Sequence, residues 1–464
     1  MVIVGAGEVG YHVAGALYRE GVDIVAVDTN PTVLEHLRQE FTLTTILGNA
    51  VDSEILANAG LDKADLFLAV TNFDETNIIA CLIAGQAGVA TTVARVKTMD
   101  FGQEASFSDR KNLGIDLIIN PYEVAAEHLA NLVATPQVTD YTQFLSDRLL
   151  LLRINIGEGS PLAGRSVLDF GQQAQIPQTL IALIQRNGNT FIPAAKETVR
   201  VGDNVYFFVE RGQVTRLFGY LGLSRRPARR VFINGGGLIG FALAKRLEKM
   251  NLDVRILEIS ETRCLQLSQH LDKALILHGD GCDSRVLRAE GVGRADMFIS
   301  LTAQDHINIV SCMLAKECGT KQAVALVKQQ ELINAVAART AIEVAFSPRL
   351  LTARKILRFV RGRNLDSFFT FPNSDIELLE LTIRPGMPCE MGPLASLELP
   401  SGVLVGAVRR GDLIFVPRGQ DHLMGGDTIL LLQQRRNRRI SRSFFLDAEG
   451  TAGSSPAAAT TATA

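Results

Sequence analysis

Met1-Val-Ile-Val-Gly-Ala-Gly-Glu-Val-Gly10 opens the chain and decides its fold class. A short β-branched run ends at Gly5 and an amphipathic segment begins near Val9, so Gly5-x-Gly7-x-x-Gly10 lies on a predicted strand-to-helix turn. Gly5 permits the tight turn, Gly7 lets the backbone approach a pyrophosphate, and Gly10 lets the helix pack closely on the strand. The first amides of that helix would face the phosphates. The motif therefore predicts a dinucleotide-binding loop.

An acidic residue follows the second apolar run at the position that such a loop requires. Asp28 ends the run Asp23-Ile-Val-Ala-Val-Asp28, 18 residues after Gly10. A carboxylate at the end of the second strand can accept hydrogen bonds from both ribose hydroxyls, and its charge repels a ribose 2′-phosphate. The pattern therefore favours NAD(H) over NADP(H).

The whole arrangement occurs twice in the chain. Val231-Phe-Ile-Asn-Gly-Gly-Gly-Leu-Ile-Gly240 repeats the glycine loop, and Glu258 again stands 18 residues after the last glycine. The correspondence continues through three further pairs of segments: 48–52 with 279–283, 70–77 with 301–308, and 95–97 with 326–328. A period near 230 residues indicates a duplicated domain pair, because solenoid repeats have periods of roughly 20–50 residues.

Composition describes an ordinary globular protein. The 464 residues are 47% hydrophobic and 21% charged, and the net charge of −2 gives no general attraction to nucleic acid or anionic lipid. We expect no signal peptide, because the chain enters a core strand at once, and no membrane span, because the apolar window 78–90 is shorter than the roughly 20 residues required. Six cysteines show no metal-ligand spacing, and Cys81 and Cys312 occupy equivalent apolar helix positions that favour core packing.

Alternating strands and helices predict an α/β fold with two doubly wound Rossmann-type parallel sheets, each followed by a small α+β domain. In the first sheet we expect strands at 1–4, 23–28, 43–47, 64–70, 91–96 and 115–119, with helices beginning near Val9, Thr32, Asp52, Asp74 and Ser106. Asp52, Asp74 and Asp305 are predicted to be helix caps. The predicted boundaries are 1–135 and 228–361 for the Rossmann domains, 140–222 and 366–447 for the small domains, and 448–464 for a disordered tail.

The small domains also repeat each other. Asn187-Gly188 predicts a hairpin turn in the first, Gly411-Asp412 replaces it in the second, and Arg186 corresponds to Arg410. Gly202-Asp203 and Gly426-Asp427 precede the last strand of each. Two basic stretches, the linker 224–230 and the cluster 435–439, are expected to be solvated, although the cluster could also contact a partner.

Four domains in this order resemble the tandem RCK/KTN family, the regulators of potassium conductance. The resemblance extends to about residue 447. It depends on Gly5-Ala-Gly-Glu-Val-Gly10, Val27-Asp-Thr-Asn30, Ala69-Val-Thr-Asn-Phe-Asp-Glu-Thr-Asn77, Ala94-Arg-Val96 and Gly235-Gly-Gly-Leu-Ile-Gly240, with Gly202-Asp203 and Gly426-Asp427 marking the small domains.

The resemblance implies a peripheral regulatory subunit of a bacterial Trk potassium uptake system. Such a protein would lie in the cytoplasm on the inner face of the membrane, bind NAD(H) or adenine nucleotides, and gate a TrkH/TrkG-like potassium-translocating subunit. Paired RCK domains imply at least a dimer and favour a tetrameric ring. One departure concerns ATP: relatives that bind it often carry an arginine between the second and third glycines, where this chain has Glu8 and Leu238. Neither residue could hold a γ-phosphate, and Glu8 would repel one; NAD(H) is the expected ligand, with ADP or ATP as a further possibility.

The candidate cofactor-binding residues follow from the two motifs and the strand ends. In the first half they are Gly5, Ala6, Gly7, Glu8, Val9, Gly10, Asp28, Asn49, Thr71, Asn72 and Arg95. In the second half they are Gly235, Gly236, Gly237, Leu238, Ile239, Gly240, Glu258, Asp280 and Thr302. Asn49, Thr71 and Asn72 would lie near the adenine and the second ribose, or could be ordinary turn formers. Arg95 could contact a phosphate or a neighbouring subunit. We assign no catalytic residues and no metal ligands.

Two other functions compete with nucleotide sensing. An NAD-dependent oxidoreductase needs a proton donor near the nicotinamide, but the small domains contain a single histidine, His422, and it has no counterpart in the first copy. A redox-sensing DNA-binding repressor needs a helix-turn-helix with a basic face, and no segment remains to supply one. We therefore expect a regulator and not an enzyme, with no nucleic-acid partner.

Overall fold

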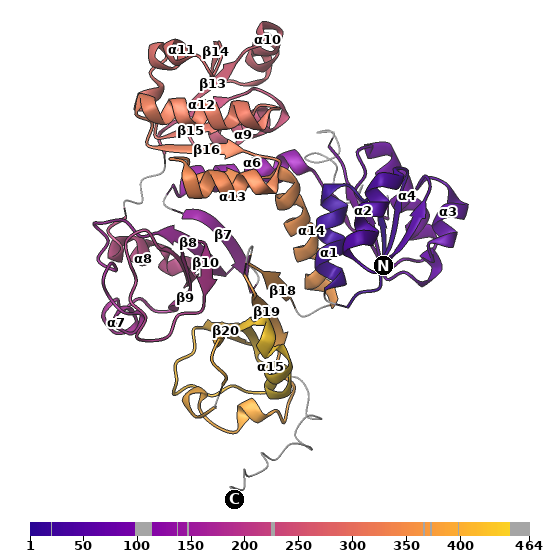
Figure 1. Cartoon of the computed structure of the whole chain (residues 1–464), viewed down its shortest axis with the longest axis vertical. Helices are drawn as coiled ribbons and strands as arrows, with labels where there is room; N and C mark the ends of the chain where they lie inside the picture. Colours follow the sequence, from indigo (N-terminus) through magenta and orange to yellow (C-terminus); the bar gives the residue numbers. More distant parts are fainter. Residues whose placement is uncertain are drawn as a thin grey trace, which may run out of the picture. The chain divides into compact units, whose positions relative to one another are not determined.

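A computed structural model gives the architecture of the chain (Figure 1). Contacts divide the chain into two compact units: one comprises Met1–Pro136 with Pro227–Val360, and the other Gln137–Arg226 with Arg361–Ala464. The structure describes the chain as far as residue 445, except residues 20, 98–113, 137, 146–147, 224–227, 365–366, 372–373 and 398.

The first unit contains two parallel six-stranded sheets of the same topology. The first has the order β3-β2-β1-β4-β5-β6 and the second the order β14-β13-β12-β15-β16-β17. The strands of the first are β1 (Val2–Val4), β2 (Val25–Asp28), β3 (Thr44–Leu47), β4 (Leu66–Ala69), β5 (Thr91–Arg95) and β6 (Leu117–Ile119). Those of the second are β12 (Arg230–Asn234), β13 (Asp253–Glu258), β14 (Leu275–His278), β15 (Met297–Ser300), β16 (Gln322–Leu326) and β17 (Val344–Phe346).

Helices connect these strands in the same sequence in both halves. The first half has α1 (Glu8–Tyr18), α2 (Pro31–Glu40), α3 (Ser53–Asn58), η1 (Leu61–Lys63), α4 (Asp74–Gln86) and α6 (Pro121–Ala134). The second half has α9 (Leu238–Glu248), α10 (Glu261–His270), α11 (Ser284–Ala289), η4 (Val292–Arg294), α12 (Asp305–Cys318), α13 (Gln330–Arg339) and α14 (Pro348–Asn364). In each sheet the strand order reverses beside the first strand, and a crevice for ligands is expected at that point.

Alternating side chains of the strands fill two cores, one on each face of a sheet. In β12, Val231 and Ile233 pack in one cluster with α9, whereas Phe232 packs on the opposite face with α11 and α12. In β1, Ile3 and Val4 divide in the same way. Strands covered on both faces need continuous apolar runs, which explains why the sequence of each central strand is apolar throughout.

The last helix of each half packs on the other half. Leu129, Leu132 and Val133 of α6 belong to the buried core around β12 and α9, and Ile356 and Leu357 of α14 belong to the core around β1 and α1. Figure 1 shows α14 beside α1 and α6 beside the second sheet. The last helix of each Rossmann domain (the nucleotide-type domains) therefore forms part of the buried core of the other.

The second unit contains two antiparallel five-stranded sheets, with the orders β10-β9-β11-β8-β7 and β18-β19-β22-β20-β21. The first comprises β7 (Val138–Phe144), β8 (Leu149–Asn155), β9 (Thr179–Arg186), β10 (Asn189–Phe191) and β11 (Asn204–Glu210), with α7 (Val167–Gln173), η3 (Arg211–Gln213) and α8 (Val214–Tyr220). The second comprises β18 (Ser367–Thr370), β19 (Ile376–Thr382), β20 (Val403–Arg410), β21 (Leu413–Phe415) and β22 (Thr428–Gln434), with η5 (Pro388–Glu390), η6 (Leu394–Ser396), η7 (Arg435–Asn437) and α15 (Arg438–Phe445). The two sheets share one core, in which Phe208 packs against Gly406.

The fold class predicted from the sequence is confirmed: two doubly wound parallel sheets, with an antiparallel domain after each. The hairpin turn at Asn187-Gly188 is also confirmed, since both residues have the positive φ angles, 52° and 82°, of a type I′ turn. Cys81 and Cys312 are buried as predicted, and burial raises the pKa of the Cys81 thiol to about 12.

Of the three predicted helix caps, Asp52 is confirmed, and Asp74 and Asp305 are wrong. Oδ1 of Asp52 accepts a hydrogen bond from the N–H of Glu54 at 2.9 Å, as a cap should. Asp74 and Asp305 instead lie inside the first turn of α4 and α12, and their Oδ2 atoms accept 2.8 Å bonds from the N–H groups of Lys97 and Lys328. Each therefore joins its helix to the end of the next strand.

The basic cluster 435–439 was expected to be solvated, but two of its arginines are also bound within the domain. Arg435 and Arg438 both donate to the buried carboxylate of Glu377, Arg438 through two nitrogens. Three other predicted features lie outside the described residues: the helix near Ser106, most of the linker and the tail. Among the helices that the structure describes, none is both long and apolar enough to cross a membrane.

Candidate nucleotide-binding clefts

Each glycine loop has one glycine for the turn, one for packing and one that nothing covers. Gly5 has a φ of +91° and Gly235 a φ of +101°, which a side chain would strain. A Cβ on Gly10 would lie 1.9 Å from the carbonyl oxygen of Gly5, so the helix passes too close for any other residue. A Cβ on Gly7 would meet no atom within 4 Å. Gly7 is therefore not needed for packing, which fits the role expected for it in admitting a pyrophosphate.

The acid at the end of the second strand is bonded to the glycine loop in both halves. Oδ2 of Asp28 accepts a hydrogen bond from the N–H of Ala6 at 2.7 Å, and Oε2 of Glu258 accepts one from the N–H of Gly236 at 2.7 Å. The second carboxylate oxygens accept bonds from Asn30 at 2.8 Å and Ser260 at 2.9 Å. An ionised carboxylate has about four acceptor sites, so both acids retain capacity for ribose hydroxyls.

The candidate residues at the third strand end form a local turn in each half. Oδ1 of Asn49 accepts a bond from the N–H of Val51 at 3.2 Å, and Oδ1 of Asp280 accepts one from Cys282 at 2.8 Å. One side-chain acceptor therefore turns the chain after the third strand in each half. The remaining candidates next to the loops differ in exposure: Val9 is buried, Ile239 packs on the second core, and Leu238 is 45% exposed.

Sequence reasoning missed two buried asparagines that hold the fourth strand end. Oδ1 of Asn77 accepts bonds from the N–H and the hydroxyl of Thr71, and its amide nitrogen donates to the carbonyls of Thr71 and Arg95, at 2.7–3.1 Å. Asn308 makes the equivalent four bonds to Thr302 and Leu326. Both asparagines lie in the repeated segments 70–77 and 301–308, and this repetition could have identified them from the sequence. Because Thr71 and Thr302 are engaged by these bonds, their hydroxyls serve first to shape the cleft.

Arg95 lies at the same edge of the first sheet. Its Nη1 donates to the carbonyl of Thr71 and to Oδ1 of Asn72, both at 3.3 Å, while its Nε is buried without a hydrogen-bond partner in the described part of the chain. Burial, followed by the charge of Arg349, lowers the pKa of Arg95, although Tyr122 and Asp74 oppose the shift. The backbone of Thr71 also packs closely on Gly5, so Arg95 lies at the same strand ends as the glycine loop.

A second arginine at this cleft comes from the other half of the chain. Nη1 of Arg349, the second residue of α14, forms an ion pair with the carboxylate of Glu8, the first residue of α1. The expectation that Glu8 would repel a phosphate stays a prediction, and the structure adds that Glu8 has an arginine partner. Only the packing of α14 on α1 reveals this contact.

The second cleft has a different polar lining. Asn234, which replaces Val4 of the first half, is buried and donates to the hydroxyls of Ser300 at 3.0 Å and Ser311 at 3.2 Å. Nε of Arg263 donates to the carbonyl of Gly236 at 2.8 Å and so braces the loop from α10. The two clefts share a backbone plan but present different side chains to a ligand.

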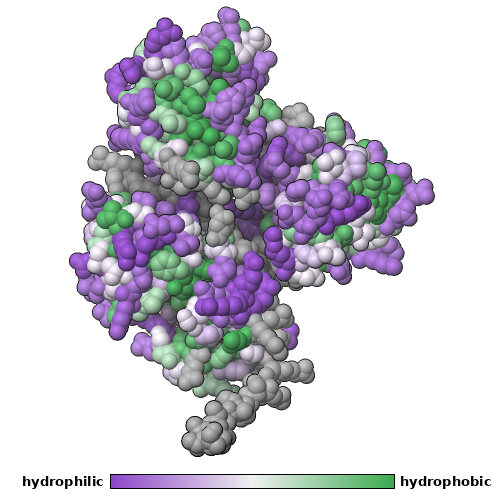
Figure 2. Space-filling model, in the orientation of Figure 1, coloured by the Kyte–Doolittle hydropathy of each residue, from purple (hydrophilic) through white to green (hydrophobic). Residues whose placement is uncertain are grey.

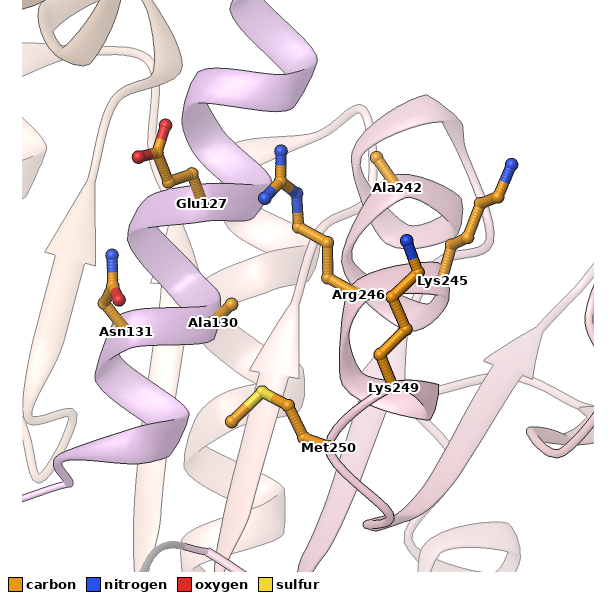
Figure 3. A pocket seen from close by; sticks show the side chains of 8 residues that line it. All are labelled: Glu127, Ala130, Asn131, Ala242, Lys245, Arg246, Lys249 and Met250. Atoms are coloured by element: carbon orange, nitrogen blue, oxygen red, sulfur yellow. The ribbon is translucent and has the colours of Figure 1, made fainter. Parts of the chain in front are cut away.

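A separate cavity of about 590 Å³ lies between α6 and α9 (Figure 3). Its lining is Glu127, Ala130, Asn131, Ala242, Lys245, Arg246, Lys249 and Met250. Three of these residues lie on α6, and the other five lie between the middle of α9 and the residues just after its end, whereas the glycine loop lies before the N-terminus of α9. Arg246 is also bound to Glu123 of α6 through two nitrogens. We therefore place the candidate site at the glycine loops and not in this cavity.

Comparison with known proteins decides the family. The TrkA-N domain model matches residues 1–121 and 231–348, and the TrkA-C domain model matches residues 151–222. The chain belongs to the TrkA family. The TrkA-N matches contain both glycine loops, both acids and both buried asparagines. The resemblance inferred from the motifs is thereby confirmed.

Relatives in this family match almost from end to end. The Trk system potassium uptake protein TrkA of Halomonas elongata is 30% identical over 96% of this chain and 98% of its own length. The TrkA of Azorhizobium caulinodans is 30% identical over 97% of this chain and 99% of its own. TrkA proteins are components of potassium uptake systems and not enzymes, so the oxidoreductase and repressor alternatives are set aside.

Solved structures confirm the fold. The GsuK RCK domain superposes with a TM-score of 0.59 at 18% identity, covering 96% of this chain and 94% of that one. The GsuK channel bound to NAD superposes with a TM-score of 0.60 at 18% identity, covering 96% of this chain and 78% of that one. The chain therefore has the RCK fold over the part that these structures cover.

Proposed function

We propose that this protein is the regulatory subunit of a Trk potassium uptake system, and that it binds NAD(H) in its two clefts to gate a membrane potassium-translocating subunit. ADP and ATP are the alternative ligands. The observation that carries the proposal is the repeated cradle: a glycine loop with open space above Gly7 and Gly237, joined to an acid by the Ala6–Asp28 and Gly236–Glu258 hydrogen bonds.

The cradle suits a ligand that is held and not transformed. The loop amides and the helix N-terminus would bind the pyrophosphate, and Asp28 or Glu258 would accept bonds from the adenosine ribose. The threonines and buried asparagines at the fourth strand end hold one another, so they shape the cleft without offering a reactive group. NADP(H) is disfavoured, because each acid would face its 2′-phosphate.

Proteins of the same fold and family support the ligand and the partner. The GsuK channel, which shares this fold, has been solved bound to NAD. The relatives that match nearly the whole chain are named as Trk system potassium uptake proteins. We infer that the present chain binds a TrkH/TrkG-like membrane subunit from the cytoplasmic side, as a peripheral protein.

Self-association is supported by apolar side chains on equivalent helices. Ile79 of α4 is 44% exposed, and Val310 and Met313 of α12 are each 45% exposed. Figure 2 shows an apolar area over the second nucleotide-type domain, where α12 lies in Figure 1. Covering these side chains would favour association. We infer at least a dimer, and a tetrameric ring around the membrane partner.

Gating requires that the ligand bind the two states of the ring unequally. A coupling of about 1–3 kcal/mol between the cleft and the membrane subunit is typical of such proteins. A nucleotide that bound both states with equal affinity would change nothing, however tightly it bound.

Two experiments test the proposal. Calorimetric titration of the full chain with NADH, NADPH, ADP and ATP should show saturable binding, with NADPH the weakest of the four. Potassium flux through the reconstituted membrane subunit should then depend on this chain and on the bound nucleotide. Absence of binding by every adenine nucleotide would contradict the sensing function, and nucleotide-independent flux would leave only a scaffold.

A further inference from the structure

Three corresponding positions carry charged side chains in one set and uncharged side chains in the other. The first cleft has Glu8 at the start of α1 and Arg95 at the end of β5, where the second has Leu238 and Leu326. Arg349 is the second residue of α14, and the corresponding residue of α6 is Tyr122 (both helices begin at a proline). The first loop thus has Glu8 paired with Arg349, whereas the second has Leu238 at the corresponding position and a different arginine, Arg263, bonded to the Gly236 carbonyl.

Packing fixes where Arg349 must lie. Ala353, Ile356 and Leu357 of α14 are buried in the core that contains Val9 and Val13 of α1. These contacts hold the first turn of α14 beside the first turn of α1, and the Arg349–Glu8 ion pair joins the two turns. The guanidinium therefore comes to the glycine loop on a rigid helix and not on a loose segment.

The pair is placed where a ligand could compete for it. The Arg349 and Glu8 side chains are 43% and 48% exposed, and exposed pairs of this kind contribute little because water and salt screen them. A pyrophosphate bound at the loop amides would offer Arg349 a doubly charged partner, and the paired N–H donors of arginine suit the oxygens of a phosphate group. Glu8, one residue after Gly7, would then be released from its arginine.

Arg95 offers a second cation on the same side. Its contacts with Thr71 and Asn72 are to neutral oxygens, and its Nε has no acceptor in the described part of the chain. A buried N–H without an acceptor is costly, so an anionic oxygen at this position would satisfy it. The first cleft therefore presents two arginines, one from each half of the chain.

We propose that Arg349, supplied by the second half, is a phosphate-binding residue of the first cleft, and that Glu8 holds it until the pyrophosphate of a nucleotide displaces the carboxylate. This inference depends on the proposed nucleotide binding and adds the identity of the ligand group and of the residue that recognises it. It also makes the clefts unequal. The first has an arginine, Arg349, whose partner is an exposed carboxylate, whereas Arg263 of the second is bonded to the backbone carbonyl of Gly236.

The test is a calorimetric titration of the full chain with NADH and with ADP at two salt concentrations. Arg349→Ala should weaken one of the two sites about tenfold, as expected for the loss of a charge-assisted bond, and should reduce its salt dependence. Arg349→Lys should restore part of the affinity. Glu8→Gln should tighten the same site, because the competing carboxylate is gone.

Lys355→Ala is the matched control. Lys355 lies on the same helix with a similar exposure of 46%, but its Nζ pairs with Glu127 of α6 at 3.1 Å and not with the loop. This variant should bind as the unmodified chain does, and thermal melting should show all variants folded. Binding by Arg349→Ala within twofold of the unmodified chain would overturn the inference and leave the proposed function standing. Failure of the unmodified chain to bind any nucleotide would overturn both.

Discussion

Oδ2 of Asp28 lies 2.7 Å from the backbone nitrogen of Ala6, so the acid of the second strand and the glycine loop of the first are one hydrogen-bonded unit. The acid was predicted from the sequence as a ribose acceptor, but the structure gives it a second task. It orients the loop amides before any ligand arrives. Glu258 and Gly236 repeat the relationship at 2.7 Å in the second half.

Replacing Asp28 should separate these two tasks. Asp28→Ala removes both the ribose acceptor and the partner of the Ala6 N–H, and we expect NADH binding to weaken at least about tenfold, since a bond to a charged group contributes roughly 1.5–3 kcal/mol. Asp28→Asn keeps one amide oxygen for Ala6 and should lose less. Calorimetry of both variants, with Glu258→Gln for the second cleft, measures the difference. Unchanged affinity in Asp28→Ala would refute the ribose role.

Two glycines of the loop are expected to have different roles, Gly7 in nucleotide binding and Gly10 in folding. Gly7 has φ −61° and ψ −177°, which alanine adopts freely, and a methyl group there would meet no atom within 4 Å. Gly7→Ala should therefore change the unfolding free energy by less than about 0.5 kcal/mol while obstructing the pyrophosphate and weakening nucleotide binding.

Gly10→Ala is the comparison for that variant. Its methyl group would lie 1.9 Å from the Gly5 oxygen, so helix and strand must separate, at a cost of roughly 1–3 kcal/mol or more. Thermal unfolding should show Gly10→Ala to be the less stable variant, whereas NADH titration should show a specific loss of affinity in the stable Gly7→Ala variant. A stable Gly7→Ala protein with full affinity would show that the pyrophosphate does not approach the loop there.

The small domains contain an ion pair whose contribution should depend on pH. Nε and Nη2 of Arg186 donate to the two carboxylate oxygens of buried Asp203, each at 2.8 Å. Burial alone would raise the pKa of Asp203, but the bonds from Arg186 and the Arg200 N–H outweigh it, and the net pKa is lowered. A carboxyl with a lowered pKa stabilises the fold above its unfolded value of about 3.9 and loses this effect as the pH falls further.

Asp203→Asn should therefore cost about 3 kcal/mol at neutral pH, because it leaves a guanidinium without its main partner. The deficit should begin to shrink below about pH 4, where the aspartate takes up a proton in the unfolded chain, and should disappear only below the lowered pKa of the folded chain. Thermal unfolding of both proteins between pH 3 and 7 measures this. A deficit that stays constant across the range would show that the charge of Asp203 is not what stabilises the domain.

The second small domain has a buried ion cluster where the first has apolar packing. Glu377 and Gln433 pair across strands at the register position that Leu150 and Val209 occupy in the first domain. Oε1 of Glu377 accepts from Arg438 at 2.9 Å and from Arg435 at 3.1 Å. Buried ion pairs are often no more stabilising than well-packed apolar residues, whereas removing one partner is costly.

We expect Glu377→Ala to destabilise the full chain by about 3 kcal/mol. The combined Glu377→Leu, Gln433→Val and Arg438→Val protein, which copies the first domain, should be as stable as the unmodified chain. Thermal unfolding measures both. If the combined variant unfolded as easily as Glu377→Ala, the cluster would be a net source of stability and not a replaceable one.

Sequence patterns were sufficient for the fold wherever a local rule applies. The glycine loops, the acids after the second strands, the Asn187-Gly188 turn and the buried Cys81 and Cys312 each depend on a few adjacent residues or on one helix face. Where a contact joins distant segments, the patterns were insufficient. Asp74 and Asp305 look like helix caps by position, but the backbone N–H groups of Lys97 and Lys328 lie closer once the strands align.

The sequence by itself determined that two dinucleotide-type loops exist and which acid serves each, because turn geometry and strand length set these locally. It could not show that Arg349 reaches Glu8 or that Glu377 meets Arg438. Those contacts join residues separated by 341 and 61 positions, and they form only when α14 packs on α1 and η7 leads α15 back over β19. Charge at a cleft depends on every segment that packs around it, so the sequence showed that the two loops differ, but only the tertiary structure decided which distant charge meets the first.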